Sequence, residues 1–157
     1  MKSSLTEGFS CSSNPQNSQS MQFRISYTEI QSMVYRKANK TIMFSYNSEH
    51  SVRVGYDVTV LFKTTNVGLD VTVEHVDNSS VLLSYSGGMG IDFMVKQALE
   101  HAKGQPGIDM LEAVEGSRLI FHLDKNPQLR QILENVILQD IRFDERDVII
   151  EFTPKAF

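Results

Sequence analysis

Cysteine is almost absent from the chain, since Cys11 is the only one among 157 residues. One cysteine excludes an intrachain disulfide, a CxxC metal site and a thiol relay. The four histidines stand at positions 50, 75, 101 and 122, with none of the HxH, HxxH or HExxH spacings that bring zinc ligands together. We therefore expect no metal site and no cofactor.

Long apolar runs and an excess of positive charge are also missing. No segment approaches the roughly 20 apolar residues of a membrane span, so we expect a soluble chain that is not transmembrane. No apolar h-region marks a secretory signal, which predicts a cytoplasmic protein, or a cell-envelope protein if a signal has been removed. The net charge of −4 argues against nucleic-acid binding.

Catalytic motifs are lacking as well. The sequence has no GxSxG nucleophile elbow and no GxxxxGK[ST] phosphate loop. A glycine-rich segment covers residues 86–90, but Phe93 stands where the last glycine of GxGxxG would be, which favours a tight structural turn. The acidic residues at 144, 145 and 147 are typical turn formers. We therefore predict that the protein is not an enzyme.

Residues 1–20 differ in composition from the rest of the chain. They hold seven serines, and Leu5 and Phe9 are their only sizeable apolar residues. A segment this polar buries too little apolar surface to offset its ordering entropy. We interpret it as a disordered tail or an expression remnant, with Met21 as an alternative start, and residues 21–157 as a single α+β domain.

What is present is a long alternation of polar and apolar residues over 51–62, which predicts one half-buried β-strand. The even-numbered positions from Val52 to Phe62 form its apolar face, and Leu61 is the only apolar residue on the other face. At about 3.3 Å per residue such a strand spans roughly 40 Å. A strand of this length has to twist and curl.

The register of the next strand follows from the rule that opposed residues share a face. A two-residue loop at residues 65–66 brings the apolar faces together and sets Phe62 against Leu69 and Val60 against Val71. The same register places His75 on the apolar face, opposite Tyr56.

The loop at residues 77–79 extends this pattern into a third pairing, with Val73 opposite Leu83 and Val71 opposite Tyr85. We predict that Val58, Val60, Val71, Val73 and Leu83 form one inward layer. Four consecutive antiparallel strands then share one apolar face, as a meander over about 40–46, 51–63, 67–76 and 80–86.

Helical periodicity predicts two amphipathic helices. Ser26 and Glu29 have the spacing of a capping box at the start of a helix over 27–38, with Asn39 near its end. The second helix is predicted over 91–103, and Gly104 suits its C-terminal end. Its buried stripe is expected to consist of Ile91, Met94, Val95, Ala98, Leu99 and Ala102.

The C-terminal third predicts further strands and a short helix. A weaker strand is expected over 109–115, and alternation of Leu119, Phe121 and Leu123 predicts a clearer one. Asn126 caps a short helix that starts at Pro127. A final hairpin pairs Ile141 and Phe143 with Val148 and Ile150. The predicted fold class is thus α+β, with a curled antiparallel sheet (a four-stranded meander plus C-terminal hairpin strands) packed against amphipathic helices.

This order of elements resembles the tubular lipid-binding (TULIP-like) superfamily and its small bacterial single-module relatives. The resemblance covers about residues 26–152 and rests on the periodicity of 51–85 and 137–152. In that superfamily a curled sheet wraps a long helix around an apolar groove. The resemblance implies an apolar ligand such as a lipid.

Two functions follow from these patterns. One is a non-enzymatic protein-interaction or assembly module, with a protein partner or a homo-oligomer. The other is a carrier or sensor of an apolar small molecule or lipid, such as an acyl chain, held in a groove between the curled sheet and the helices. The candidate ligand-binding residues for the second function are Phe62, Leu69, Met94, Phe121, His75 and Tyr56.

Phe93 is the candidate contact residue for a partner. On a helical wheel it lies about 200° from Ile91 and on the side of Lys96 and Glu100, away from the apolar stripe. We predict that it is at least partly exposed and that it marks the contact edge of the protein.

Overall fold

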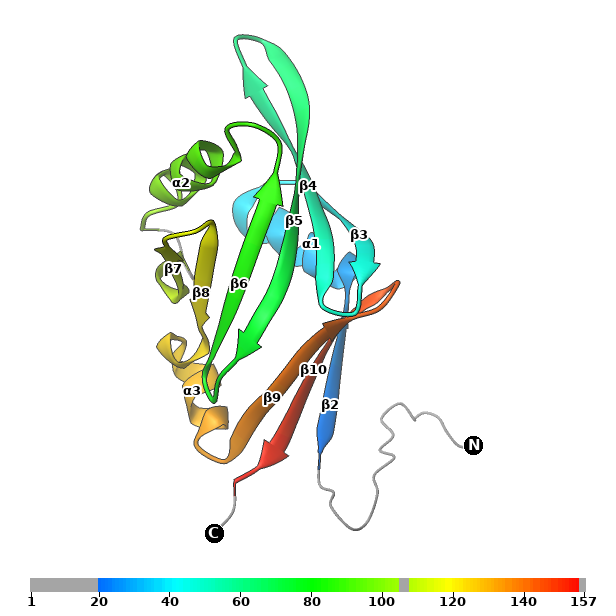
Figure 1. The fold of residues 1–157 in the computed structure, drawn as a ribbon, viewed down its shortest axis with the longest axis vertical. Helices are drawn as coiled ribbons and strands as arrows, with labels where there is room; N and C mark the ends of the chain where they lie inside the picture. The colour runs from blue at the N-terminus through cyan, green and yellow to red at the C-terminus, as the bar shows by residue number, and fades with distance from the viewer. Residues whose placement is uncertain (1–19, 105–107, 156–157) are drawn as a thin grey trace.

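The computed structural model describes residues 20–104 and 108–155, and this part of the chain forms two antiparallel sheets and three α-helices (Figure 1). This arrangement confirms the predicted α+β class with a curled antiparallel sheet. The strands are β2 (Met21–Ser26), β3 (Ile42–Ser48), β4 (Ser51–Val60), β5 (Lys63–Val76), β6 (Ser80–Gly87), β7 (Leu111–Val114), β8 (Arg118–His122), β9 (Val136–Phe143) and β10 (Asp147–Pro154). The α-helices are α1 (Tyr27–Ala38), α2 (Ile91–His101) and α3 (Pro127–Leu133), and short 3-10 turns lie at η1 (Ile108–Met110) and η2 (Leu123–Lys125).

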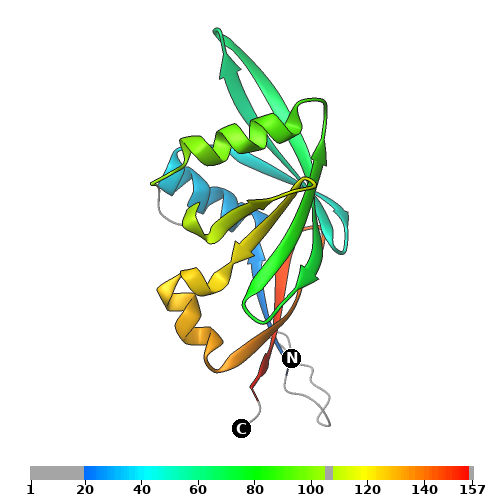
Figure 2. The ribbon, with the colours of Figure 1, turned by 60° about the vertical axis from the view of Figure 1, so that its left-hand side comes forward.

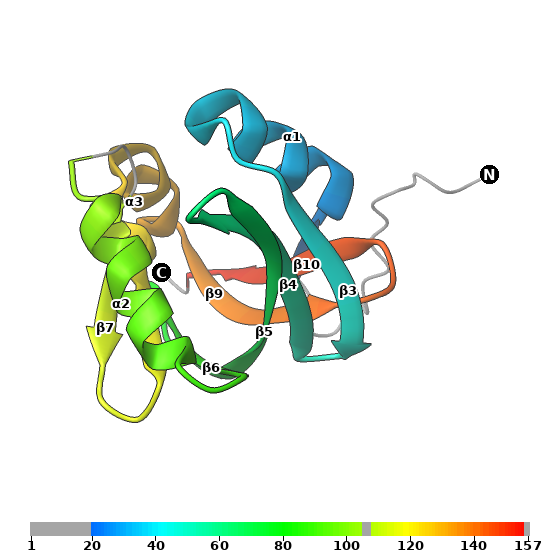
Figure 3. The same cartoon turned by 90° about the horizontal axis from the view of Figure 1, so that it is seen from above.

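The larger sheet has six strands in the order β3-β4-β5-β6-β8-β7, and its first four strands are the predicted meander. Seen from above, the sheet curls, with β3 on one side, β7 on the other, and β4, β5 and β6 between them (Figure 3). α1 lies beside β3 and β4, whereas α2 and α3 lie on the side of β7.

The hairpin between β4 and β5 turns at Leu61 and Phe62, so the predicted loop at residues 65–66 is wrong. Leu69 lies opposite Val54, and Phe62 lies in the turn instead of pairing with Leu69. The long strand is therefore shorter than predicted, and it ends where Leu61 interrupts the alternation.

The predicted faces of the long strand are nevertheless correct. Val52 is opposite Val71 and Val60 is opposite Lys63, a register shifted by eight residues from the predicted one. A shift by an even number keeps each side chain on its original face. The inward layer is therefore corrected: Val52 and Val54 take the places across from Val71 and Leu69 that we assigned to Val60 and Phe62.

The pairing of β5 with β6 is as predicted over its first half, with Val71 opposite Tyr85 and Val73 opposite Leu83. The register then shifts between Val73 and His75, which is a β-bulge or similar irregularity. An extra residue in one strand moves the following side chains to the other face.

His75 consequently does not lie where the sequence placed it. It is exposed and lies opposite Leu82, while Val76 packs against the core. Tyr56 pairs with Val67. The predicted juxtaposition of His75 and Tyr56 on the apolar face is therefore wrong, because the bulge at Glu74 and the shifted hairpin separate them.

The smaller sheet joins the two ends of the described chain. β10 is its central strand, with β2 on one side and β9 on the other. The predicted C-terminal hairpin is confirmed, since Phe143 pairs with Val148 and Ile141 with Ile150. β2 is not predicted from the sequence, and the hairpin strands are predicted in the same sheet as the meander, whereas β9 and β10 form a separate sheet with β2.

The helix ends follow the predicted capping chemistry. Ser26 and Glu29 form a capping box, and these hydrogen bonds, the one from the Ser26 backbone foremost, lower the pKa of Glu29. Asn39 closes α1 in the left-handed conformation. The Asn126 side chain accepts two backbone N–H groups at the start of α3.

The core lies between the two sheets and reaches α3 and the start of α1. Seven buried residues form one apolar cluster, composed of Tyr27, Val52, Val73, Val81, Leu133, Leu138 and Phe143. α2 contributes no buried residue, and Tyr27 is the only buried residue of α1. The predicted stripe of α2 is only half-buried, and Ala98 is exposed.

Candidate functional site

The β4–β5 hairpin projects beyond the rest of the sheet (Figures 1 and 2). Pairing with β3 ends at Tyr56, and pairing with β6 ends at Leu69. Within the described chain, residues 57–60 and 63–66 therefore form strand pairs only with each other. We call this two-stranded projection, residues 57–66, the distal arm.

The turn of the distal arm presents two large apolar side chains to solvent. The exposed fraction is 88% for Leu61 and 103% for Phe62. Both residues have positive φ, 52° and 67°, as the central residues of a type I′ turn do. Such turns favour Asn-Gly, because left-handed backbone costs a residue with a Cβ about 1–2 kcal/mol. The arm thus ends in a strained turn made of apolar residues.

The glycine-rich loop that leads into α2 carries a third exposed apolar side chain. Met89 is 103% exposed between two glycines. Gly90, the N-cap of α2, has φ 82°, a conformation that side chains disfavour. The segment is a structural turn, as predicted, and it holds Met89 out from the molecule.

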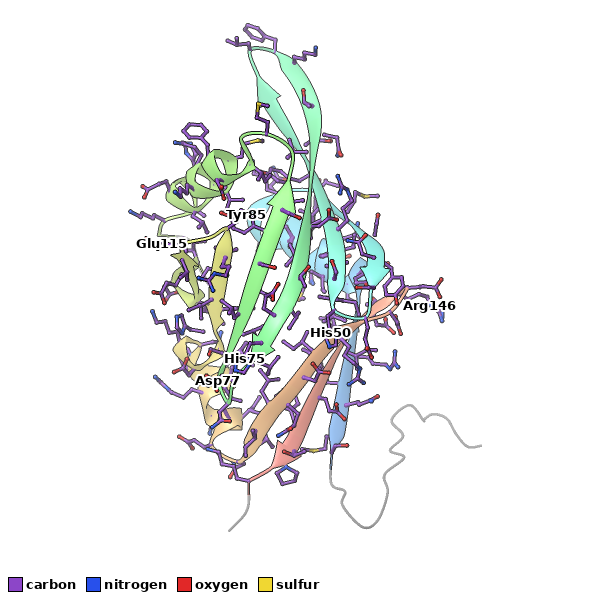
Figure 4. All side chains as sticks on the ribbon, in the orientation of Figure 1. His50, His75, Asp77, Tyr85, Glu115 and Arg146 are labelled. Carbon is purple, nitrogen blue, oxygen red and sulfur yellow. The ribbon has the colours of Figure 1, made fainter. Side chains whose placement is uncertain are left out.

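Side-chain hydrogen bonds of Asp92 link the first turn of α2 to the sheet. Its Oδ1 accepts hydrogen bonds from Ser117 Oγ at 2.6 Å and from Tyr85 Oη at 2.8 Å. The Ser117 and Tyr85 bonds lower the pKa of Asp92, in that order of importance. Burial and the bond to Asp92 raise the pKa of Tyr85, and Figure 4 shows Tyr85 beside this end of α2.

Phe93 follows directly in α2 and is 67% exposed, which confirms its predicted exposure. The more apolar side of the same helix is half-buried, through Met94, Val95 and Leu99. α2 and the loop before it lie at the end of the molecule from which the distal arm rises (Figures 1 and 2). We call Leu61, Phe62, Met89 and Phe93 together the apolar end.

The two segments that carry the apolar end, residues 57–66 and 87–103, have no net charge, although the chain as a whole is acidic. The distal arm holds one aspartate and one lysine, and residues 87–103 hold two acidic residues and two lysines. Glu100 and Lys103 are paired at 2.9 Å. The charged residues counted here are Asp57, Lys63, Asp92, Lys96, Glu100 and Lys103.

The predicted ligand-binding residues are not brought together. Phe62 stands at the tip of the distal arm, whereas Phe121 packs against the core. His75 lies beside the β5–β6 turn, at the end of β5 away from α2 (Figure 4). Leu69, Tyr56 and Met94 are half-buried in β5, β4 and α2.

An open depression of about 570 Å³ lies between α1 and the start of β3. Sequence reasoning did not identify it, because nothing in the helical pattern shows where β3 starts relative to α1. Its lining consists of Thr28, Gln31, Ser32, Tyr35, Arg36, Thr41 and Ile42.

The charged side chains form local pairs. His50 Nε2 lies 3.3 Å from Asp140 where the two sheets meet, and His122 Nε2 lies 2.7 Å from Glu112. Across residues 20–104 and 108–155, no group of three or more His, Cys, Asp or Glu side chains is arranged to hold a metal ion. In the same ranges, no helix is both long and apolar enough to cross a membrane.

Comparison with protein-family models, with curated proteins and with solved structures finds no match. The resemblance to the tubular lipid-binding superfamily therefore stays a prediction. The function has to be argued from the geometry of this chain.

Proposed function

We propose that the protein is a non-enzymatic protein-interaction module whose contact surface is the apolar end. One observation carries the proposal: four large apolar side chains, 67–103% exposed, stand on three segments at one end of the molecule. Single exposed apolar residues are common on protein surfaces, whereas several large ones at one end of a molecule favour an interaction site.

The backbone of the turn supports the same proposal. Left-handed conformation at two consecutive bulky residues lowers the stability of the chain. Backbone strain of this kind is characteristic of contact and switch regions, where the strained conformation is the one that the partner binds. Leu61 and Phe62 contribute nothing to the core cluster, so their presence in the turn is best explained by a contact outside the chain.

The carrier hypothesis receives less support. A ligand groove between sheet and helices would be lined by Phe62, Leu69, Met94 and Phe121, and these side chains lie apart. The depression beside α1 is open, whereas pockets for apolar ligands enclose most of the ligand.

Affinity capture from a lysate of the source organism tests the proposal. Three immobilised baits are compared: wild type, Phe62→Ser/Phe93→Ser, and Phe23→Ser. The last is a matched control, because Phe23 is 57% exposed on β2, away from the apolar end (Figure 1). We expect wild type and Phe23→Ser to retain the same associations, with themselves or with other proteins, and the double variant to lose them.

An unchanged set of associations in the double variant would overturn the proposal. Mass spectrometry of an organic extract of the purified protein provides the second measurement. A stoichiometric lipid in that extract would favour the carrier function instead.

A further inference from the structure

We propose that the partner at the apolar end is a second copy of this chain, joined by reciprocal exchange of the distal arms. In this dimer the Leu61-Phe62 turn of each copy packs on the half-buried apolar side of α2 in the other copy. The inference rests on the proposed function, and it adds the identity of the partner and the symmetry of the contact.

The distal arm has the length that such an exchange needs. Its four residue pairs beyond Tyr56 extend roughly 13 Å at about 3.3 Å per residue. Figure 2 shows the arm rising past α2 of its own chain. The turn is therefore placed to contact another molecule that approaches this end.

The receiving surface is present on the same end of the same chain. α2 has no buried residue, and its side chains Met94, Val95 and Leu99 are only half-buried. An amphipathic helix normally buries such a stripe. Here the chain's own sheet covers it incompletely, so an incoming Leu-Phe turn can complete its burial.

The distal arm and the receiving surface on α2 lie at the same end of the chain, so two copies can form a closed, symmetric dimer. When two apolar ends face each other across a two-fold axis, each arm meets the α2 of the other copy, so every contact is made twice. A donor and an acceptor on opposite ends would instead build an open chain of molecules. The arrangement therefore predicts a dimer and no larger assembly.

Charge favours a second copy over a lipid surface. The segments that carry the apolar end, residues 57–66 and 87–103, hold three acidic residues and three lysines, within a chain of net charge −4. Two neutral ends meet without net repulsion. An anionic bilayer attracts proteins through clustered Lys and Arg, and this end has no excess of them.

The available area suits a dimer of moderate affinity. An aromatic side chain buries roughly 150–250 Å², so the two phenylalanines of the apolar end supply roughly 300–500 Å² per copy, to which Leu61 and Met89 add, against roughly 800 Å² in a standard interface.

Sedimentation velocity over a wide range of protein concentration tests the dimer. We expect wild type and Phe23→Ser to form dimers, and Phe62→Ser and Leu99→Ser, one change on each side of the contact, to weaken dimerisation at least tenfold. A second variant, Leu61→Asn/Phe62→Gly, separates association from folding, since Asn-Gly suits the type I′ turn. It should be monomeric and melt at a higher temperature than monomeric wild type.

Disulfide trapping tests the exchange itself. In a Cys11→Ser background, Phe62→Cys and Leu99→Cys proteins are mixed and oxidised. We expect a linked dimer with one chain of each kind, and a closed, doubly linked dimer from the chain that carries both cysteines. A ladder of polymers, a disulfide within one chain, or links only between two Phe62→Cys chains would overturn the exchange.

The two proposals fail in different ways. A wild type that is monomeric at every concentration overturns the second-copy inference. The proposed function then still depends on whether Phe62→Ser/Phe93→Ser loses other proteins that wild type captures. A dimer that is unaffected by every substitution at the apolar end overturns both.

Discussion

The hydroxyl of Tyr27 donates a 2.6 Å hydrogen bond to the backbone carbonyl of Asp144, far along the chain in the β9–β10 turn. The backbone N–H of Tyr27 also donates to the Arg146 carbonyl at 2.9 Å. The Tyr27 ring is stacked on Phe44 with the centroids 5.1 Å apart. One residue at the start of α1 thus links the helix, the β9–β10 turn and the β3 strand.

Removal of the Tyr27 hydroxyl should destabilise the protein without disturbing the stacking. We expect Tyr27→Phe to lower the free energy of unfolding by about 1–2 kcal/mol, because the Asp144 carbonyl loses a partner in a partly buried site. Urea unfolding measures the change. Tyr35→Phe is the control, since Tyr35 is 57% exposed, and an equal loss there would contradict the argument.

The same tyrosine should impose an alkaline limit on stability. Burial and the nearby charges of Asp144 and Asp147 raise the pKa of Tyr27 to about 12. Because the folded pKa exceeds the value of about 10 in the unfolded chain, the contribution is complete below pH 10 and is lost as the pH rises through about 12. The stability difference between wild type and Tyr27→Phe should therefore narrow over this interval.

Asp92 should make stability depend on pH at the acidic end. Hydrogen bonds from Ser117 and Tyr85 lower its pKa in the folded protein. A lowered pKa means that the stabilisation is complete above the unfolded value of about 3.9 and is lost as the pH falls through the folded one. We expect Asp92→Asn to be less stable than wild type near neutral pH, and the difference to close below about pH 4. A difference that persists at pH 2 would show that lost packing is the cause.

Relief of backbone strain should stabilise the distal arm. Each of the two left-handed residues lowers the stability of the folded chain by about 1–2 kcal/mol. Glycine at Phe62 removes this strain but lowers stability by about 0.5–1 kcal/mol, because glycine loses more conformational entropy on folding. Leu61→Asn/Phe62→Gly should therefore raise the free energy of unfolding by roughly 1–2 kcal/mol when measured on monomer. The reversed order Leu61→Gly/Phe62→Asn is the matched control for composition. Loss of stability in both variants would contradict the assigned turn.

The core and α2 should respond differently to truncation. Val52 is 3% exposed within the core cluster, so Val52→Ala should cost about 2 kcal/mol through lost contacts and a small cavity. Leu99→Ala on α2 should cost less than about 1 kcal/mol, because no residue of this helix is buried. Hydrogen exchange offers an independent measurement, with faster exchange expected in α2 than in β5 and β6. Equal protection would show that α2 belongs to the core.

Periodicity and capping predicted most elements of this fold. The Ser26–Glu29 capping box located α1, and Asn126 with Pro127 located α3, because these signals act over a few residues. The sequence also predicted which side chains of the meander strands share a face, since this depends only on the alternation of apolar residues.

The position of the hairpin turn was not predictable from the same rules. Residues 65–66 include an asparagine and fit turn chemistry better than Leu61-Phe62, so the standard preferences point to the wrong loop. The one available signal was Leu61, the single apolar residue on the polar face. A break in the alternation marks the end of the strand, and the strain at the turn depends on function as well as on local preference.

Two residues of the apolar end were named from the sequence, but only Phe93 was assigned to a partner contact, and Phe62 was placed in a ligand groove. The helical wheel identified Phe93, because its direction depends on the local helix alone. Met89 and Leu61 were missed, since their exposure depends on how the loop and the arm stand relative to the sheet. The bulge after Val73, which removes His75 from the apolar face, likewise leaves no clear mark in the sequence.

The small sheet has a consequence for the order of folding. β10 lies between β2 and β9, and its pairing of Asp147 with Ser26 joins distant parts of the chain. Pairings between sequence neighbours close short loops and form early, whereas pairings across most of a chain carry a larger entropic cost and form late. The meander should therefore assemble first, with the β2–β10 ladder as the last step. Before β2 pairs during refolding, β10 is bound to β9 on one side and has an unpaired edge on the other. We expect the chain to be most prone to aggregation at this stage.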